Sequence, residues 1–174
     1  MLFAALLGSG VAAGSAEDMK NYAVTPVPFT AVQIEDEFWS PRLETNRKVT
    51  IPYCFRRCEE TGRIDNFAKA GGLMPGAFVG IYYDDSDVFK VIEGAAYALA
   101  LHPDPQLDKY LDELIVKIAA AQEKDGYLYT ARTLNPDNPP QASGPTRWSN
   151  EAASHELYNV GHLYEGAVAH QQAT

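Results

Sequence analysis

The chain has 174 residues, of which 46% are hydrophobic and 21% charged, a composition typical of globular proteins. Its formal net charge of −9 and its lack of a basic run exclude a nucleic-acid-binding footprint, so no nucleic-acid partner is expected. The two cysteines, Cys54 and Cys58, are too few for a zinc site. We therefore expect them to be buried or half-buried thiols.

Residues 1–20 have the pattern of a secretion signal without its basic start. An apolar stretch from Leu2 to Leu7 is followed by small residues through Ala16 and then by acidic residues. The apolar stretch is too short to span a bilayer, so no membrane association is expected. We expect a secreted or periplasmic protein whose domain occupies residues 21–174; an apolar tail that is not a signal is the alternative.

After this segment, the chain predicts a short β segment and then a helix. Apolar residues alternate, with prolines between them, over Val24–Ile34, which indicates one or two edge-type strands. Ser40 and Pro41 suit the N-cap and the first position of a helix that runs to about Arg47. The helix is expected to resume only after Pro52, because the residue before a proline is biased away from helical geometry.

Two long helices should follow a long loop. Residues 61–80 are rich in glycine and weakly patterned, which predicts a functional loop. Apolar residues then keep helical spacing from a cap at Asp85 or Ser86 to about residue 101. Asp104 and the proline after it start another helix, which ends near residue 124. Residues 126–150, dense in proline and asparagine, are expected to be a loop.

These elements predict an all-α fold that forms part of an (α/α)6 barrel, or toroid, with the short β segment near its N-terminus. A four-helix bundle fits less well because its connections are short. A helical-repeat interaction protein would need a fixed repeat period and similar short loops. The loops at 61–80 and 126–150 argue against it.

The stretch SHELYNVGHLYEGAVAH, Ser154 to His170, is predicted to be a helix with a polar face. His155 and His162 are about two turns apart, roughly 10 Å along the axis, which is too far to share one ion easily. Asn159 stands where the H-E-x-x-H zinc motif requires its second histidine, so that motif is excluded. The histidines either face a ligand or are hydrogen-bonded at a helix contact. A separate, mostly apolar stripe is expected to pack inward: Leu157, Val160, Gly161, Tyr164 and Val168.

Three segments together resemble a known family. They are YDDSDVFKVIEGAAYALALHPDP, AAAQEKDGYLYT and HELYNVGHLYEGAVAH, and the likeness runs from about Val32 to Thr174. The chain resembles the N-terminal part of the catalytic domain of glycoside hydrolase family 127, the β-L-arabinofuranosidases. The resemblance implies an (α/α)6 barrel followed by β-sandwich domains, and release of L-arabinofuranose from plant oligosaccharides or glycoprotein glycans.

The resemblance also implies a retaining reaction with a zinc-held cysteine nucleophile and a glutamate acid/base. A metal keeps such a thiol in its reactive thiolate form. In the family these residues lie beyond the point that matches Thr174, and neither Cys54 nor Cys58 matches them. Zinc is therefore expected in the full-length enzyme, whereas no catalytic or metal-binding residue is assigned here and the fragment alone is expected to be inactive.

What the resemblance leaves to this chain is one wall of the sugar site. His155 matches the histidine that contacts the terminal sugar, and Phe78, Val79 and Trp148 are further candidates for substrate contact. Supporting roles are expected for four other residues: Glu156, Asn159, His162 and Asp87. The run that contains Asp87 has a simpler reading as a helix cap.

A rival enzyme is another toroid enzyme acting on carbohydrate, such as an unsaturated uronidase or a lyase. An acidic sugar would be paired by clustered guanidinium groups. The loops offer only Arg132 and Arg147, which favours a neutral sugar.

Overall fold

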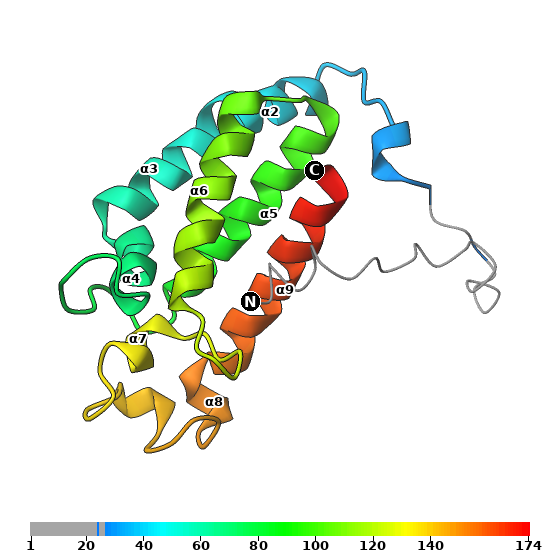
Figure 1. Ribbon diagram of the computed structural model, residues 1–174. Coiled ribbons are helices and arrows are strands. Elements are labelled where there is room, and N and C mark those ends of the chain that lie inside the picture. Colours follow the sequence, from blue (N-terminus) through cyan, green and yellow to red (C-terminus); the bar gives the residue numbers. More distant parts are fainter. Residues whose placement is uncertain (1–23, 25–26) are drawn as a thin grey trace.

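The computed structural model describes Val24 and residues 27–174, and every regular element in this part of the chain is a helix (Figure 1). The expected all-α class is confirmed, while the predicted signal at 1–20 lies outside the described residues. The helices, in chain order, are η2 (Phe29–Ala31), α2 (Trp39–Thr45), η3 (Asn46–Thr50), α3 (Ile51–Glu60), α4 (Arg63–Ala70), α5 (Asp85–Leu101), α6 (Pro105–Ala121), α7 (Thr130–Thr133), η4 (Gln141–Ser143), α8 (Glu151–Ser154) and α9 (Glu156–Ala173).

The β segment expected at Val24–Ile34 is wrong for the described residues, which form only a single 3-10 turn, η2, in this segment. Val27, Val32 and Ile34 are exposed. An alternating pattern becomes a strand only where a neighbouring strand accepts its hydrogen bonds. In the described part of the chain, no such neighbour is present.

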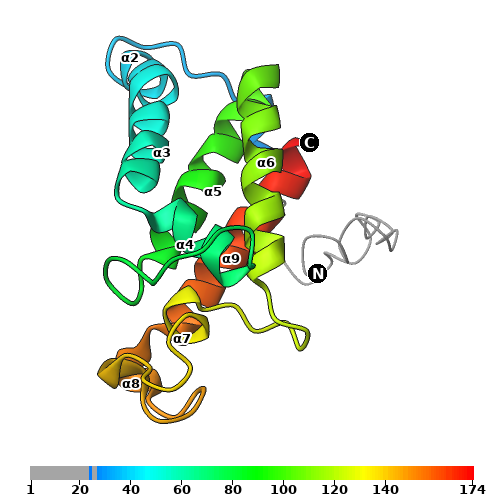
Figure 2. The same ribbon diagram turned by 60° about the vertical axis from the view of Figure 1, so that its left-hand side comes forward.

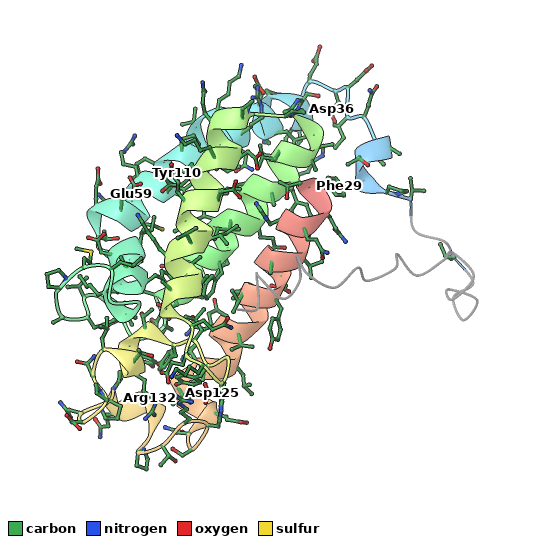
Figure 3. All side chains as sticks on the ribbon, in the orientation of Figure 1. Phe29, Asp36, Glu59, Tyr110, Asp125 and Arg132 are labelled. Atoms are coloured by element: carbon green, nitrogen blue, oxygen red, sulfur yellow. The ribbon has the colours of Figure 1, made fainter. Side chains whose placement is uncertain are left out.

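Helices α2 and α3 are joined without a break, contrary to the expected interruption at Pro52. The intervening segment, η3, is a π-helix. Proline lacks an N–H group and its ring crowds the carbonyl of the preceding turn, so a wider turn accommodates it. The predicted cap was also misplaced: Asp36, labelled in Figure 3, accepts the backbone N–H groups of Phe38 and Ser40 at 3.0 and 3.1 Å and also that of Trp39.

The segment at 61–80 is only partly a loop, because it contains α4. Gly62 supplies the left-handed backbone (φ 76°) from which α4 begins. Gly71 ends the helix where it meets α6, since a Cβ at this position would lie 2.7 Å from the side chain of Ala120. Three of the four buried residues of α4 are apolar, and they pack into the core that the weak sequence pattern did not indicate.

The core lies between α3, α4, α5, α6 and α9. Helices α5 and α9 run side by side in the same direction, and their first residues lie at the same end of the molecule (Figures 1 and 2). Gly166 permits this close approach, because a Cβ there would lie 3.0 Å from the backbone oxygen of Phe89 in α5. On the other side, Tyr110 of α6 donates a hydrogen bond of 2.8 Å to Glu59 of α3 (Figure 3).

Candidate functional site

An aromatic cluster lies at the end where α5 and α9 begin. It is built by the segment that precedes α5 and by the loops around α7 and α8 (Figure 1). Phe78 and Tyr82 pack against Tyr127 and Tyr129, and Tyr82 also contacts the ring of His155, with 5.8 Å between ring centroids. Residues far apart in sequence thus meet at one end of the helices. Two of the predicted sugar contacts, Phe78 and His155, belong to this cluster.

His155 is not part of the helix that its sequence predicted. It has a left-handed backbone (φ 57°) between α8 and α9, so it does not share a helical face with His162. Its Nδ1 lies 2.9 Å from the backbone oxygen of Ala153, a group that can only accept. Nδ1 therefore donates, and in the neutral ring Nε2 remains an acceptor that suits a sugar hydroxyl.

Three tyrosines surround the His155 ring. Tyr83 lies nearest, tilted, with centroids 4.7 Å apart, and Tyr158 meets the ring edge-on at 5.6 Å. Tyr82 completes the group. Such packing restricts the imidazole to one orientation. Tyr158, which is exposed, also meets the ring of His162 edge-on, with 4.6 Å between ring centroids. His162, one of the predicted supporting residues, is thus linked to His155 through Tyr158.

Trp148 joins the cluster from the loop before α8. Its ring meets that of Tyr127 edge-on with centroids 5.4 Å apart, and 40% of its surface is exposed, which leaves a face that can stack on a sugar. Its backbone is left-handed (φ 63°). Its N–H donates to Glu156 at 3.0 Å.

Glu156 is a buried carboxylate at the first position of α9. Its Oε1 accepts a 2.5 Å hydrogen bond from Tyr127, and the Nε of Arg132 lies 3.7 Å from it, an ion pair without a hydrogen bond. Burial, and then the hydrogen bond to Glu156, raise the pKa of Tyr127, so the phenol stays a neutral donor. The predicted supporting role of Glu156 thus has a physical basis in its contacts.

Val79 is held by its backbone rather than by its side chain. The amide of Asn66, which is fully buried in α4, donates to the Val79 oxygen at 2.8 Å and accepts its N–H at 3.1 Å. The Val79 side chain is 41% exposed. These two hydrogen bonds to Asn66 fix the segment that contains Phe78 and leads to the tyrosines before α5.

Asp87 pairs with cations instead of capping α5. Its carboxylate lies 3.0 Å from Arg63 Nε and 3.5 Å from Lys90 Nζ. Lys90 in turn lies 5.1 Å from the centroid of Tyr158, which connects Asp87 to the edge of the cluster. The carboxylates of Asp84 and Asp85 also bond to partners other than the first N–H groups of the helix, so the simple capping interpretation is wrong.

Asn159 and the inward face of α9 differ from expectation. The apolar stripe predicted to pack inward is wrong, since Leu157, Tyr164 and Val168 are about half exposed. Small residues and Asn159 face α5 instead, because the two helices approach closely at Gly166. Both amide atoms of Asn159 are buried without a hydrogen-bond partner in the described part of the chain.

The two loop arginines bind other groups of the protein. Arg132 donates to the backbone oxygens of Ser143 and Gly144 at 2.7 and 2.9 Å. Arg147 pairs with Asp125 at 2.6 Å and also with Glu123. Figure 3 labels Arg132 and Asp125 in this loop region. Both guanidinium groups thus bind oxygen atoms of the chain itself.

The cysteines do not fit a thiolate zinc site. They share a cavity of about 460 Å³ with four cationic or acidic neighbours: Arg57, Arg63, Asp87 and Lys90. Burial raises the pKa of Cys58 to about 11, which favours the thiol over the thiolate that zinc binds. Cys54 and Cys58 are therefore not zinc ligands in this arrangement.

A different set of side chains could hold a metal. The ligand atoms of Glu93, His162 and Glu165 lie within 4.8 Å of one another. His162 Nδ1 already contacts a carboxylate oxygen of Glu165 at 3.0 Å, so these two groups can bind each other without a metal. Glu93 lies in α5, whereas His162 and Glu165 lie in α9, so spacing along the sequence does not reveal this cluster.

Sequence reasoning missed several residues that build the cluster. Tyr82, Tyr83 and Asp85 lie just before or at the start of α5, and Arg132 lies in α7. The adjacent tyrosines before a helix start were a usable signal, since exposed aromatic pairs suit sugar faces. Nothing in the pattern could show that Arg132 folds back onto its own loop.

Comparison with known proteins identifies the family of the chain. The sequence model of the family described as "Beta-L-arabinofuranosidase, GH127 catalytic domain" matches residues 31–174. A non-reducing end beta-L-arabinofuranosidase of Bifidobacterium longum subsp. longum is 43% identical over 111 residues, which are 64% of this chain and 16% of that protein.

Two solved structures are also similar. One is a GH127 beta-arabinofuranosidase with 54% identity and a TM-score of 0.81, covering 86% of this chain and 24% of the other. The second, a GH127 beta-L-arabinofuranosidase from Geobacillus stearothermophilus T6, has 37% identity and a TM-score of 0.75, covering 82% and 22%. The chain thus spans less than a quarter of the length of these relatives. It belongs to the GH127 beta-L-arabinofuranosidase family, within the catalytic domain.

Proposed function

We propose that this chain forms one wall of the sugar site of a β-L-arabinofuranosidase. The observation that carries the proposal is His155, whose Nε2 is left as an acceptor inside a ring of tyrosines. An acceptor beside aromatic faces is the arrangement that binds a neutral sugar through one hydroxyl and its apolar face. Phe78 and Trp148 extend the same wall, and Val79 positions Phe78.

The full protein is proposed to release L-arabinofuranose from an arabinose-containing oligosaccharide or glycoprotein glycan. Support comes from the family membership and from Arg132 and Arg147, whose guanidinium groups already bind oxygen atoms of this chain. The proposed nucleophile, acid/base and zinc ligands are not residues of this chain. The chain alone is therefore expected to bind the sugar without cleaving it.

We also propose an (α/α)6 barrel for the whole domain and a secreted or periplasmic location. Helices α5 and α9 pack side by side in the same direction, and α6, which lies between them in the chain, returns in the opposite direction; this is the packing expected of such a barrel. The apolar start of the sequence supports export. In the described residues, no helix is long and apolar enough to cross a membrane.

Ligand-observed NMR tests the sugar site directly. Methyl β-L-arabinofuranoside is titrated into the chain, into His155→Ala and into His102→Ala, an exposed histidine at the far end of α5 that serves as the control. We expect binding that His155→Ala abolishes and His102→Ala leaves intact. Equal binding by all three proteins, or tighter binding of methyl β-D-glucuronide, would overturn the proposal.

A further inference from the structure

Two residues in the described part of the chain have a left-handed backbone without being glycine, Trp148 and His155. Bulky residues rarely adopt this conformation, and it persists where the surroundings impose it. Both are predicted sugar-binding residues. They lie at the two ends of the short segment that contains α8.

Glu156 contacts both ends of this segment. It follows His155 directly in the chain, and its Oε2 accepts the Trp148 N–H at 3.0 Å. Its side chain is fully buried, with relative exposure of 0%. A buried carboxylate is costly unless hydrogen bonds compensate it, so its partners are strongly held in place.

Those partners fix the rest of the loop. Tyr127, which donates to Glu156 at 2.5 Å, carries the ring against which Trp148 packs. Arg132, 3.7 Å from the carboxylate, donates to backbone oxygens of the loop at Ser143, 2.7 Å away, and Thr146, 3.2 Å away. One buried charge thus connects α7, the loop before α8 and the start of α9.

We propose that Glu156 is a positioning residue that holds Trp148 in the same wall as His155 and so sets the affinity of the sugar site. This rests on the proposed function, in which Trp148 stacks on the sugar. Glu156 itself contacts no substrate. It acts through the Trp148 backbone and the Tyr127 ring, and it leaves the exposed face of Trp148 free for the ligand.

The experiment follows Trp148 by fluorescence. The chain has two tryptophans, so Trp39→Phe leaves Trp148 as the sole indole emitter. In this background we compare Glu156→Gln with Glu151→Gln, an exposed glutamate of α8. Glutamine has the shape of glutamate but no charge. Its N–H₂ group replaces one of the two oxygens, so it faces either the Tyr127 hydroxyl or the Trp148 N–H, both of which donate to Glu156. Tyr127→Phe is a milder variant that keeps the ring and removes one hydrogen bond.

We expect Glu156→Gln to lower the Trp148 anisotropy and to weaken binding of methyl β-L-arabinofuranoside by about tenfold, the loss expected for a hydrogen bond to a charged group. Tyr127→Phe should shift both readouts in the same direction by less, and Glu151→Gln should shift neither. Circular dichroism identifies the folded variants.

A merely structural role would lower the melting temperature and leave the folded protein unchanged. Wild-type anisotropy and affinity in folded Glu156→Gln, or in Tyr127→Phe if the former does not fold, would therefore overturn the inference. Absence of arabinofuranoside binding by the unmodified site would instead overturn the proposed function. The anisotropy comparison would still decide whether Glu156 positions Trp148.

Discussion

Asp85 should make the stability of the protein depend on pH. It is the first residue of α5, it is buried, and its carboxylate accepts the backbone N–H of Thr130 at 2.8 Å and the Thr130 hydroxyl at 2.5 Å. Burial raises its pKa from 3.8 to about 6, although the two bonds from Thr130 oppose the shift, and neighbouring Asp84 adds to it. These two bonds join the start of α5 to α7.

The sign of the effect follows from this raised pKa. The folded state holds the Asp85 proton more tightly than the unfolded state, so ionisation disfavours folding. The protonated Asp85 side chain contributes its full stabilisation of the folded state below pH 3.8, the pKa of this group in the unfolded chain. That contribution is lost as the pH rises through about 6, its pKa in the folded protein. A shift of about two units corresponds to a loss on the order of 3 kcal/mol.

Asp85→Asn removes the titration and keeps the geometry. The amide oxygen can accept the Thr130 N–H, and the amide N–H₂ can donate to the Thr130 hydroxyl. Urea unfolding followed by circular dichroism gives the free energy of unfolding between about pH 4 and about pH 7. Between these two pH values, the free energy of unfolding of Asp85→Asn should rise relative to that of the unmodified chain by on the order of 3 kcal/mol.

The matched control is Asp112→Asn, an exposed aspartate of α6. It should follow the pH dependence of the unmodified chain. The reasoning is refuted if the curves of Asp85→Asn and the unmodified chain run parallel across the interval. Parallel curves would mean that Asp85 is ionised equally easily in the folded and unfolded states.

Three further predictions concern packing, thiol reactivity and capping. Gly166→Ala should cost about 1–3 kcal/mol because its Cβ would lie 3.0 Å from a backbone oxygen of α5. By contrast, a Cβ at Gly161 would have no atom within 4 Å, so Gly161→Ala should stabilise the protein by about 0.5–1 kcal/mol. Melting temperatures of the two variants equal to that of the unmodified chain would contradict both predictions. Cys54 should react with a thiol reagent before buried Cys58, whose pKa is raised to about 11; mass spectrometry of the labelled site checks this, and equal rates would disprove it. Asp104→Ala removes the side-chain cap of α6 and should cost about 1 kcal/mol in thermal unfolding; an unchanged melting temperature would show that the cap contributes nothing.

Local chemistry correctly located the two long central helices. The Asp104 carboxylate accepts the N–H groups of Gln106 and Leu107 at 3.0 and 3.2 Å, as an aspartate before a proline predicts. Helix α5 ends at Leu101, before the His102–Pro103 pair that predicted its end. These signals act within one turn of the chain, so one sequence suffices to read them.

Elements that depend on distant partners were misjudged. Helix α4 is stabilised by burial against α6, and the predicted β segment has no neighbouring strand among the residues that the structure describes. The apolar stripe of α9 remains exposed because Gly166 allows the opposite face to approach α5. In each case burial against another helix decided the outcome, and periodicity alone could not report which face would be covered.

The sequence by itself determined the helical class, the family, the bounds of α5 and the start of α6, whereas the end of α6 lies at Ala121 instead of near residue 124. Only the tertiary structure decided that His155 leaves the helix in a left-handed conformation with Nδ1 bound to Ala153. It also decided that Glu156 reaches Trp148 and Tyr127. The reason is that capping and periodicity are local, whereas a buried charge chooses partners from whichever segments the fold brings within hydrogen-bond distance.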